Sequence, residues 1–256
     1  MHRTSESILL AVGIFVGMVG LLELGRRLGA ARGAAADDGK RAGLGSIEAA
    51  IFGLMGLLIA FTFSGTASRY EHRRQLIVDE ANAIGTAWLR LDLVPQAAQP
   101  GLHDLLRRYL DERLATYELW GDADAVRTSL ERTAAVQAEL WAHATAACRE
   151  RPDAVTAQLV PALNAVFDIA TTRTMYREAH TPNIVYLVLA ALAFASALLA
   201  GIAVAGSARS WVHMIGFPLL LSVTIYVILD LEYPRVGLLR LDATEQVLVE
   251  LRQSMG

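Results

Sequence analysis

The chain has 256 residues, of which 54% are hydrophobic and 19% are charged. Soluble domains are usually about 45–50% apolar and about 25% charged, so this chain has more hydrophobic residues than the core of a soluble domain requires. The net charge of −3 provides no basic field that would favour nucleic acid as a partner. The only cysteine is Cys148, which excludes an intrachain disulfide and a thiolate metal cluster.

Four long apolar stretches account for the excess of hydrophobic residues. Each approaches the roughly 20 residues that a helix needs to cross the hydrocarbon layer, since the rise is about 1.5 Å per residue. The residues between the second and third stretches have the composition of a soluble domain. The sequence therefore predicts four transmembrane helices, at about 7–24, 49–68, 183–208 and 211–230.

The predicted fold is all-α: a polytopic membrane protein with four transmembrane helices and a cytoplasmic helical bundle inserted between helices 2 and 3. In the insertion, apolar residues such as Leu102, Leu106 and Leu110 recur at helical spacing and indicate a buried face. A linker rich in Ala, Gly and Arg joins helices 1 and 2, and we expect it to be flexible. The predicted boundaries are 1–68 for helices 1 and 2 with the flexible linker at 25–45, 69–180 for the bundle, 181–232 for helices 3 and 4, and 233–256 for a C-terminal tail.

Basic residues near the ends of the spans favour one orientation by a small margin. Arginine and lysine are slightly more numerous on the side that would hold both termini and the bundle. Because cytoplasmic loops carry an excess of such residues, we expect these parts to be cytoplasmic. Pro234 and Gly237 follow helix 4, and we expect them to turn the tail back along the membrane surface.

Polar residues within helix 2 are the strongest functional signal, because polar groups at membrane depth are costly. One face combines apolar residues, two hydroxyl groups and two arginines, and consists of Met55, Ile59, Thr62, Thr66, Arg69 and Arg73. The roughly opposite face consists of the small residues Ala49, Gly53, Gly56, Ala60 and Ser64. Copies of the chain could pack through the small face and leave the first face to line a pore, with the arginines attracting anions. Alternatively, the arginines anchor the helix at the membrane surface and the threonines bond to their own backbone.

The end of helix 4 carries Asp230 and Glu232 beside Arg235. A carboxylate at this depth needs a nearby base, either Arg235 or an arginine from the end of helix 2. We interpret these three residues as members of structural ion pairs. The sequence has no glycine-rich phosphate loop, nucleophile elbow or zinc-binding spacing, so it predicts no enzyme activity, cofactor or metal site.

Three segments resemble the recurring segments of the bacterial bestrophin-like membrane proteins, a family of unknown function. Residues 60–95 read AFTFSGTASRYEHRRQLIVDEANAIGTAWLRLDLVP, residues 163–173 read LNAVFDIATTR, and residues 230–237 read DLEYPRVG. Bestrophins proper are pentameric anion channels with four spans, a cytoplasmic helical domain and a pore lined by the second span. The resemblance thus implies a homo-oligomer, such as a pentamer, that conducts chloride or other inorganic anions.

The same resemblance places the chain in the bacterial plasma (inner) membrane as a multi-pass protein, with membrane lipid and further copies of itself as partners. A second hypothesis is a membrane-anchored interaction or signalling module whose helical domain binds a cytoplasmic partner. Shared architecture alone does not decide between the two.

Overall fold

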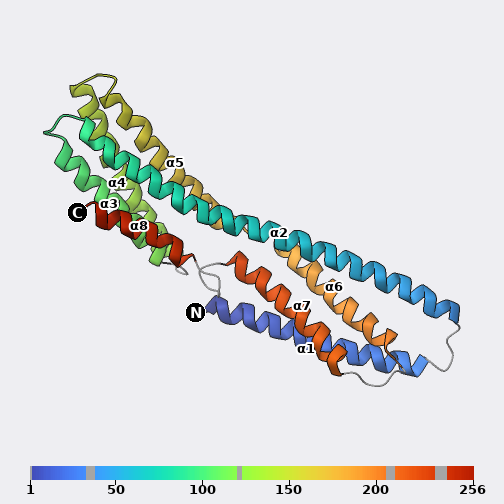
Figure 1. Ribbon diagram of the computed structural model, residues 1–256. Coiled ribbons are helices and arrows are strands. Elements are labelled where there is room, and N and C mark those ends of the chain that lie inside the picture. Colours follow the sequence, from blue (N-terminus) through green and yellow to red (C-terminus); the bar gives the residue numbers. More distant parts are fainter. Residues whose placement is uncertain (1, 33–37, 120–122, 206–210, 234–240) are drawn as a thin grey trace. The chain divides into compact units, whose positions relative to one another are not determined.

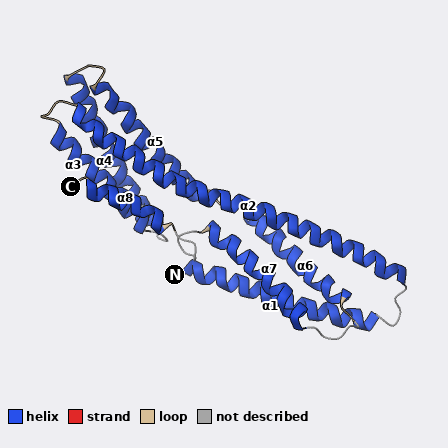
Figure 2. Cartoon of the chain, in the orientation of Figure 1, coloured by secondary structure: helices blue, strands red, loops and turns tan. Residues whose placement is uncertain are grey.

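The computed structural model describes residues 2–32, 38–119, 123–205, 211–233 and 241–256. Within these ranges every regular element is a helix, which confirms the predicted all-helical fold (Figure 2). The helices in chain order are shown in Figure 1: α1 (His2–Arg32), α2 (Asp38–Arg90), η1 (Leu91–Leu93), α3 (Gln99–Glu118), α4 (Ala123–Glu150), η2 (Thr156–Gln158), α5 (Leu159–Glu178), α6 (Asn183–Ala203), α7 (Trp211–Glu232) and α8 (Asp242–Ser254).

The helices form two compact units. The membrane unit comprises Met1–Tyr70 and His180–Leu239 and contains α1, the first part of α2, α6 and α7. The helical unit comprises Glu71–Ala179 and Arg240–Gly256 and contains the rest of α2 with α3, α4, α5 and α8. Helix α2 contributes to both units because no proline interrupts it before Pro95.

Within the described ranges, four helical segments are long and apolar enough to cross a membrane, which confirms the four apolar helices predicted from the sequence. They are Ser7–Ala31, Gly45–Leu93, Asn183–Ala203 and Met214–Glu232. The first extends beyond its predicted end at Leu24, which directly follows the acidic residue Glu23. There the Glu23 carboxylate accepts hydrogen bonds of 2.9 Å from both Arg26 and Arg27. These pairs, at three- and four-residue spacing, compensate its charge within the helix.

The linker between the first two spans is helical where the structure describes it. Helix α1 continues to Arg32 and α2 begins at Asp38, so residues 25–32 and 38–45 are helical, and the flexibility of the linker stays a prediction. Residues 33–37 of the linker lie outside the described residues. The physical reason is composition: alanine has the highest helix propensity of all residues, and it offsets the glycines of this segment.

The C-terminal tail differs from the prediction that it lies along the membrane surface. Helix α8 is part of the helical unit, where Leu248 and the two residues that flank the helix, Leu241 and Met255, are buried. Arg107 of α3 donates a hydrogen bond of 2.8 Å to the backbone oxygen of Met255. Spacing of seven residues places these three apolar side chains on one side of the helix, which favours docking on a protein core.

In the membrane unit, α1 and α6 approach each other at backbone distance. A Cβ atom at Gly25 would lie 2.1 Å from the backbone oxygen of Leu198, and one at Gly201 would lie 2.1 Å from that of Leu22. No side chain fits in either gap. Small residues at helix crossings allow such close packing in membranes, where the hydrophobic effect does not drive helices together.

Candidate functional site

The face of α2 that was predicted to line a pore is turned toward other helices of the same chain. Met55, Thr62 and Thr66 are buried, and Ile59 packs against the apolar core of the membrane unit. The Ser196 hydroxyl of α6 lies 3.5 Å from the sulfur of Met55. One turn earlier, Phe52 meets Phe217 of α7 edge to face. In the single chain, the Met55–Thr66 face therefore packs within the membrane unit.

The two threonine hydroxyls on this face are satisfied by their own helix. Thr62 donates to the backbone oxygen of Leu58 at 2.7 Å, and Thr66 donates to that of Thr62 at 2.8 Å. Such bonds to the residue four positions earlier compensate a buried hydroxyl without any partner helix. The two buried threonine hydroxyls therefore need no permeating ion to satisfy their hydrogen bonds.

Arg69 is the next residue along this face, and it forms an ionic cluster with residues at the end of α7. Its guanidinium donates to the Glu232 carboxylate at 2.8 Å and to the Thr66 hydroxyl at 3.0 Å, and it also contacts the Thr181 hydroxyl. The carboxylate of Glu232 is fully buried and accepts a further bond of 2.8 Å from the backbone N–H of Thr181. His180 lies 3.3 Å from the same carboxylate. In the structure, the base beside Glu232 is thus Arg69, an arginine of the second span.

The predicted ion pairs also included Asp230 and Arg235. Asp230 is buried and accepts a hydrogen bond of 3.3 Å from the Tyr226 hydroxyl. Arg235 lies outside the described residues, so its assignment to a structural ion pair stays a prediction.

Arg73, the last residue of the predicted face, belongs to the helical unit. Its guanidinium donates to the backbone oxygens of Tyr176 at 3.3 Å and Ala179 at 2.8 Å, at the carboxyl end of α5. A cation is favourable there because the last carbonyls of a helix lack partners and carry partial negative charge. Arg69 and Arg73 therefore both bind groups of their own chain, although they are adjacent on one face of α2.

The exposed side of α2 presents a different stripe. Leu54, Leu57 and Phe61 are between 53% and 68% exposed, and Ser64 and Ser68 continue the same side toward the Arg69 end. These five residues follow steps of three and four, so they form one continuous line along the helix. The line contains no charged residue. Gly53, Gly56 and Ala60 flank it and are exposed as well.

A second polar cluster, which sequence reasoning missed, lies in the core of the helical unit. Glu80 of α2 is fully buried, receives a hydrogen bond of 2.6 Å from Arg113 of α3, and also pairs with Arg173 of α5. The Tyr117 hydroxyl donates to the Glu80 carboxylate at 2.7 Å. Arg173 reaches on to Glu245 of α8 at 3.4 Å. The signal was a glutamate within the apolar stripe of Ile77, Ala81 and Ile84.

The environment keeps this cluster in one protonation state. Burial, together with the adjacent Glu80 carboxylate, raises the pKa of Tyr117 well above its ordinary value. Tyr117 therefore stays protonated at physiological pH and remains a hydrogen-bond donor to Glu80. The five members come from four helices, α2 (Glu80), α3 (Arg113 and Tyr117), α5 (Arg173) and α8 (Glu245), so the cluster joins four helices of the helical unit. Among the residues that the structure describes, no group of three or more His, Cys, Asp or Glu side chains is placed to hold a metal ion.

Comparison with known proteins shows the family to which the chain belongs. A family model described as the Bestrophin-like domain matches residues 33–245. The chain belongs to the Bestrophin-like family. The resemblance of three sequence segments is thereby confirmed over most of the chain, and the long insertion after the second span is part of the matched region. No curated protein matches this Bestrophin-like chain in sequence.

Solved structures agree with the family assignment at the level of the fold. Three crystal structures of variants of a bacterial bestrophin homologue from Klebsiella pneumoniae match the Bestrophin-like chain with TM-scores of 0.67, 0.64 and 0.62. Each is 15% identical in sequence; the matches cover 96%, 95% and 94% of this chain and 97%, 98% and 98% of the respective homologue chains. At this identity the likeness shows a shared fold.

Proposed function

We propose that this Bestrophin-like membrane protein is a homo-oligomeric ion channel in which α2 lines the conduit. The observation that carries the proposal is the exposed stripe of α2. The exposed faces of α1, α6 and α7 carry bulky apolar side chains such as Leu9, Leu187 and Leu220, as lipid requires. The exposed face of α2 also carries bulky apolar side chains, Leu54, Leu57 and Phe61, but it adds Ser64 and Ser68 and three small residues. Polar residues in a membrane span mainly face protein or water, not lipid.

The exposed stripe is a better candidate for the pore wall than the face predicted from the sequence, because that face is buried within the chain. In an assembly around an axis, Leu54, Leu57 and Phe61 would form an apolar constriction, followed by a wider hydroxyl-lined section at Ser64 and Ser68. Apolar constrictions control ion flow by excluding water. The face from Met55 to Arg69 would line the conduit only if α2 turned or separated from α6 and α7.

Thiol accessibility distinguishes the two faces of α2. In a Cys148→Ala background, Ser64→Cys and Thr62→Cys place a thiol on the exposed and on the buried face, respectively. A charged, water-soluble thiol reagent should reduce the bilayer current of Ser64→Cys by roughly an order of magnitude, because the adduct narrows the conduit. The current of Thr62→Cys should be unchanged. If the reagent blocked only the Thr62→Cys current, the result would support the face predicted from the sequence as the pore wall. A silent, monomeric protein would leave the interaction module as the better hypothesis.

We propose inorganic anions as the permeant ions, on the basis of the family resemblance and of the cationic Arg69, which follows Ser68 at the end of the buried face of α2. Glu232 compensates this charge in the present arrangement. Glu232→Gln should therefore raise the chloride-to-sodium permeability ratio, by at least about twofold, because an uncompensated guanidinium concentrates anions locally. Reversal potentials in a salt gradient measure this ratio. Glu71→Gln, which removes an exposed carboxylate paired with Arg74, is the control, and equal ratios in both variants would contradict the role of Arg69.

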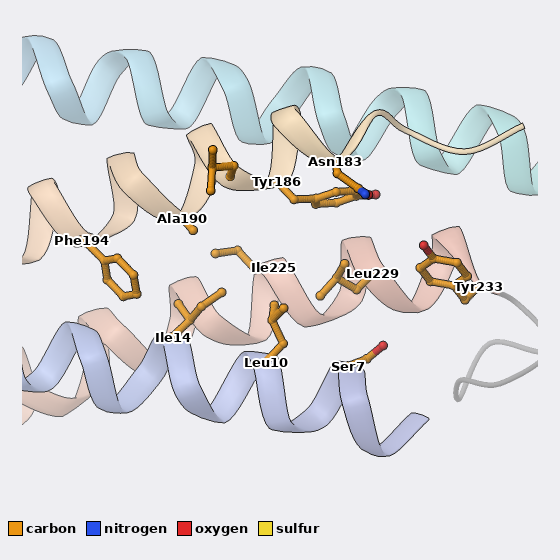
Figure 3. Close-up of a pocket in the computed structure, with 11 residues that line it drawn as sticks. Ser7, Leu10, Ile14, Asn183, Tyr186, Ala190, Phe194, Ile225, Leu229 and Tyr233 are labelled. Carbon is orange, nitrogen blue, oxygen red and sulfur yellow. The ribbon is translucent and has the colours of Figure 1, made fainter. Parts of the chain in front are cut away.

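The membrane unit also supports a proposal for orientation. The Arg69–Thr181–Glu232 cluster brings together the end of the α2 span, the start of α6 and the end of α7. Ser7, at the start of the first span, lies at this same end as Asn183 and Tyr233 (Figure 3). We propose that this end faces the cytoplasm of a bacterial plasma membrane. Both termini and the insertion would then be cytoplasmic.

A further inference from the structure

A partly open cavity of about 710 Å³ lies in the membrane unit, between α1, α6 and α7 (Figure 3). Most of its wall is aliphatic or aromatic, and none of the described residues that line it is charged. A cavity of this size is within the usual range for small-molecule and cofactor sites, which are mostly apolar with a few placed polar groups. Its contents are therefore expected to be apolar along most of their length.

The polarity of the wall changes from one end of the cavity to the other. Ser7, Asn183 and Tyr233 lie at the end where α1 and α6 begin and α7 ends, whereas Ile14, Ala190 and Phe194 lie deeper (Figure 3). The Phe194 ring rests directly against Gly17, where a Cβ atom would come within 2.9 Å of the ring. The deep end is thus an apolar floor, and the outer end offers hydroxyl and amide groups.

The depth of the cavity corresponds to one leaflet of a bilayer. Asn183 and Phe194 are eleven positions apart in α6, which is about 16 Å along a helix axis. The hydrocarbon core of a bilayer is about 30 Å thick, so one leaflet contributes about 15 Å. An occupant that reaches from the polar end to the floor therefore has the length of an acyl chain in a single leaflet.

We propose that this cavity binds one acyl chain of an acylglycerol, with the ester and glycerol oxygens at Ser7, Asn183 and Tyr233. The uncharged lining explains why the recognised group is the ester and glycerol region and not a charged headgroup, since a buried charge would need a counterion. The bound chain completes the packing between α1, α6 and α7. This inference concerns the membrane unit alone and holds whether or not the protein conducts ions.

Native mass spectrometry of the full-length protein in detergent tests the proposal. The probes are 1-oleoylglycerol and, in a separate titration, dioleoylphosphatidylcholine, which share the acylglycerol ester and differ in headgroup and chain number. Wild type should retain one probe molecule per protomer. Ala190→Trp should weaken binding at least about tenfold, because the indole occupies the volume of the acyl chain. Ala191→Trp, at the adjacent and lipid-exposed position, should bind as wild type does.

A second variant keeps the test decisive if Ala190→Trp folds poorly. Asn183 is exposed at the start of α6, so Asn183→Leu leaves the core unchanged and removes an amide at the polar end. It should weaken binding of the same probe severalfold. Retention of only 1-oleoylglycerol would identify a free monoacyl ligand, and retention of the phospholipid would identify a bilayer lipid. Equal binding by wild type, Ala190→Trp and Asn183→Leu, or no binding by wild type, would overturn the proposal.

Discussion

Glu80→Gln is expected to destabilise the helical unit by about 3–5 kcal/mol, the usual cost of removing one partner from a buried ion pair. The Glu80 carboxylate is fully buried between Arg113, which is 3% exposed, and Arg173, which is 10% exposed. A glutamine has the same shape but no charge. It would leave two guanidinium groups in the core beside the neutral Tyr117 hydroxyl, with Glu245 at 3.4 Å from Arg173. Most of the desolvation of the two arginines would then no longer be offset.

Thermal unfolding in detergent and hydrogen exchange measure this effect. Protection of amides in α3 and α5 should fall, and the transition of the helical unit should move down by on the order of 10 °C. Glu71→Gln is the matched control, because Glu71 lies on the same helix and forms an exposed pair with Arg74. Such surface pairs contribute about 0–1 kcal/mol. If the two variants unfold alike, the buried cluster does not hold the helical unit together.

Gly25→Ala is expected to disrupt the packing of α1 on α6, although it adds only one methyl group. That group would lie 2.1 Å from the backbone oxygen of Leu198, and the nearby atoms are backbone atoms that cannot rotate away. The two helices would have to separate along their whole crossing. The expected loss is at least about 3 kcal/mol, at or above the upper end of ordinary overpacking in a core.

Gly20→Ala supplies the comparison for this second result. Gly20 lies on the same helix, and a Cβ atom there would meet nothing within 4 Å. In open space, replacing a helical glycine by alanine usually stabilises by about 1 kcal/mol. The two substitutions should therefore shift the unfolding temperature of the detergent-solubilised protein in opposite directions. A similar melting temperature for both variants would show that α1 and α6 do not cross as closely as the structure indicates.

The four apolar helices and the all-helical insertion could be predicted from the sequence because their signals are local. The hydropathy of about 20 consecutive residues decides whether a helix is suited to lipid, and a three- and four-residue period decides whether it has a buried face. The family could be recognised for a similar reason, since the segment of residues 60–95 is continuous in the chain. None of these predictions depends on which helices are neighbours in the folded chain.

The roles of the two faces of α2 depend on tertiary structure. Both faces were identifiable from spacing, but only the positions of α6 and α7 show that Met55, Thr62 and Thr66 are buried and that Leu57, Phe61 and Ser64 are exposed. From the sequence, Arg69 could be named only as one of several bases available to compensate Glu232. That it is the partner was decided by packing between residues 163 positions apart.

Tertiary structure alone also joined Glu80 to Arg113, Arg173 and Glu245, and placed α8 in the helical unit. Burial is a property of what surrounds a side chain, so an amphipathic segment such as α8 does not specify whether a membrane surface or a protein core covers its apolar face. Hydropathy and helical period are properties of consecutive residues, so they can be read from the sequence. Charge compensation and the choice of a buried face depend on contacts between residues far apart in the chain, and these contacts form only when the helices pack.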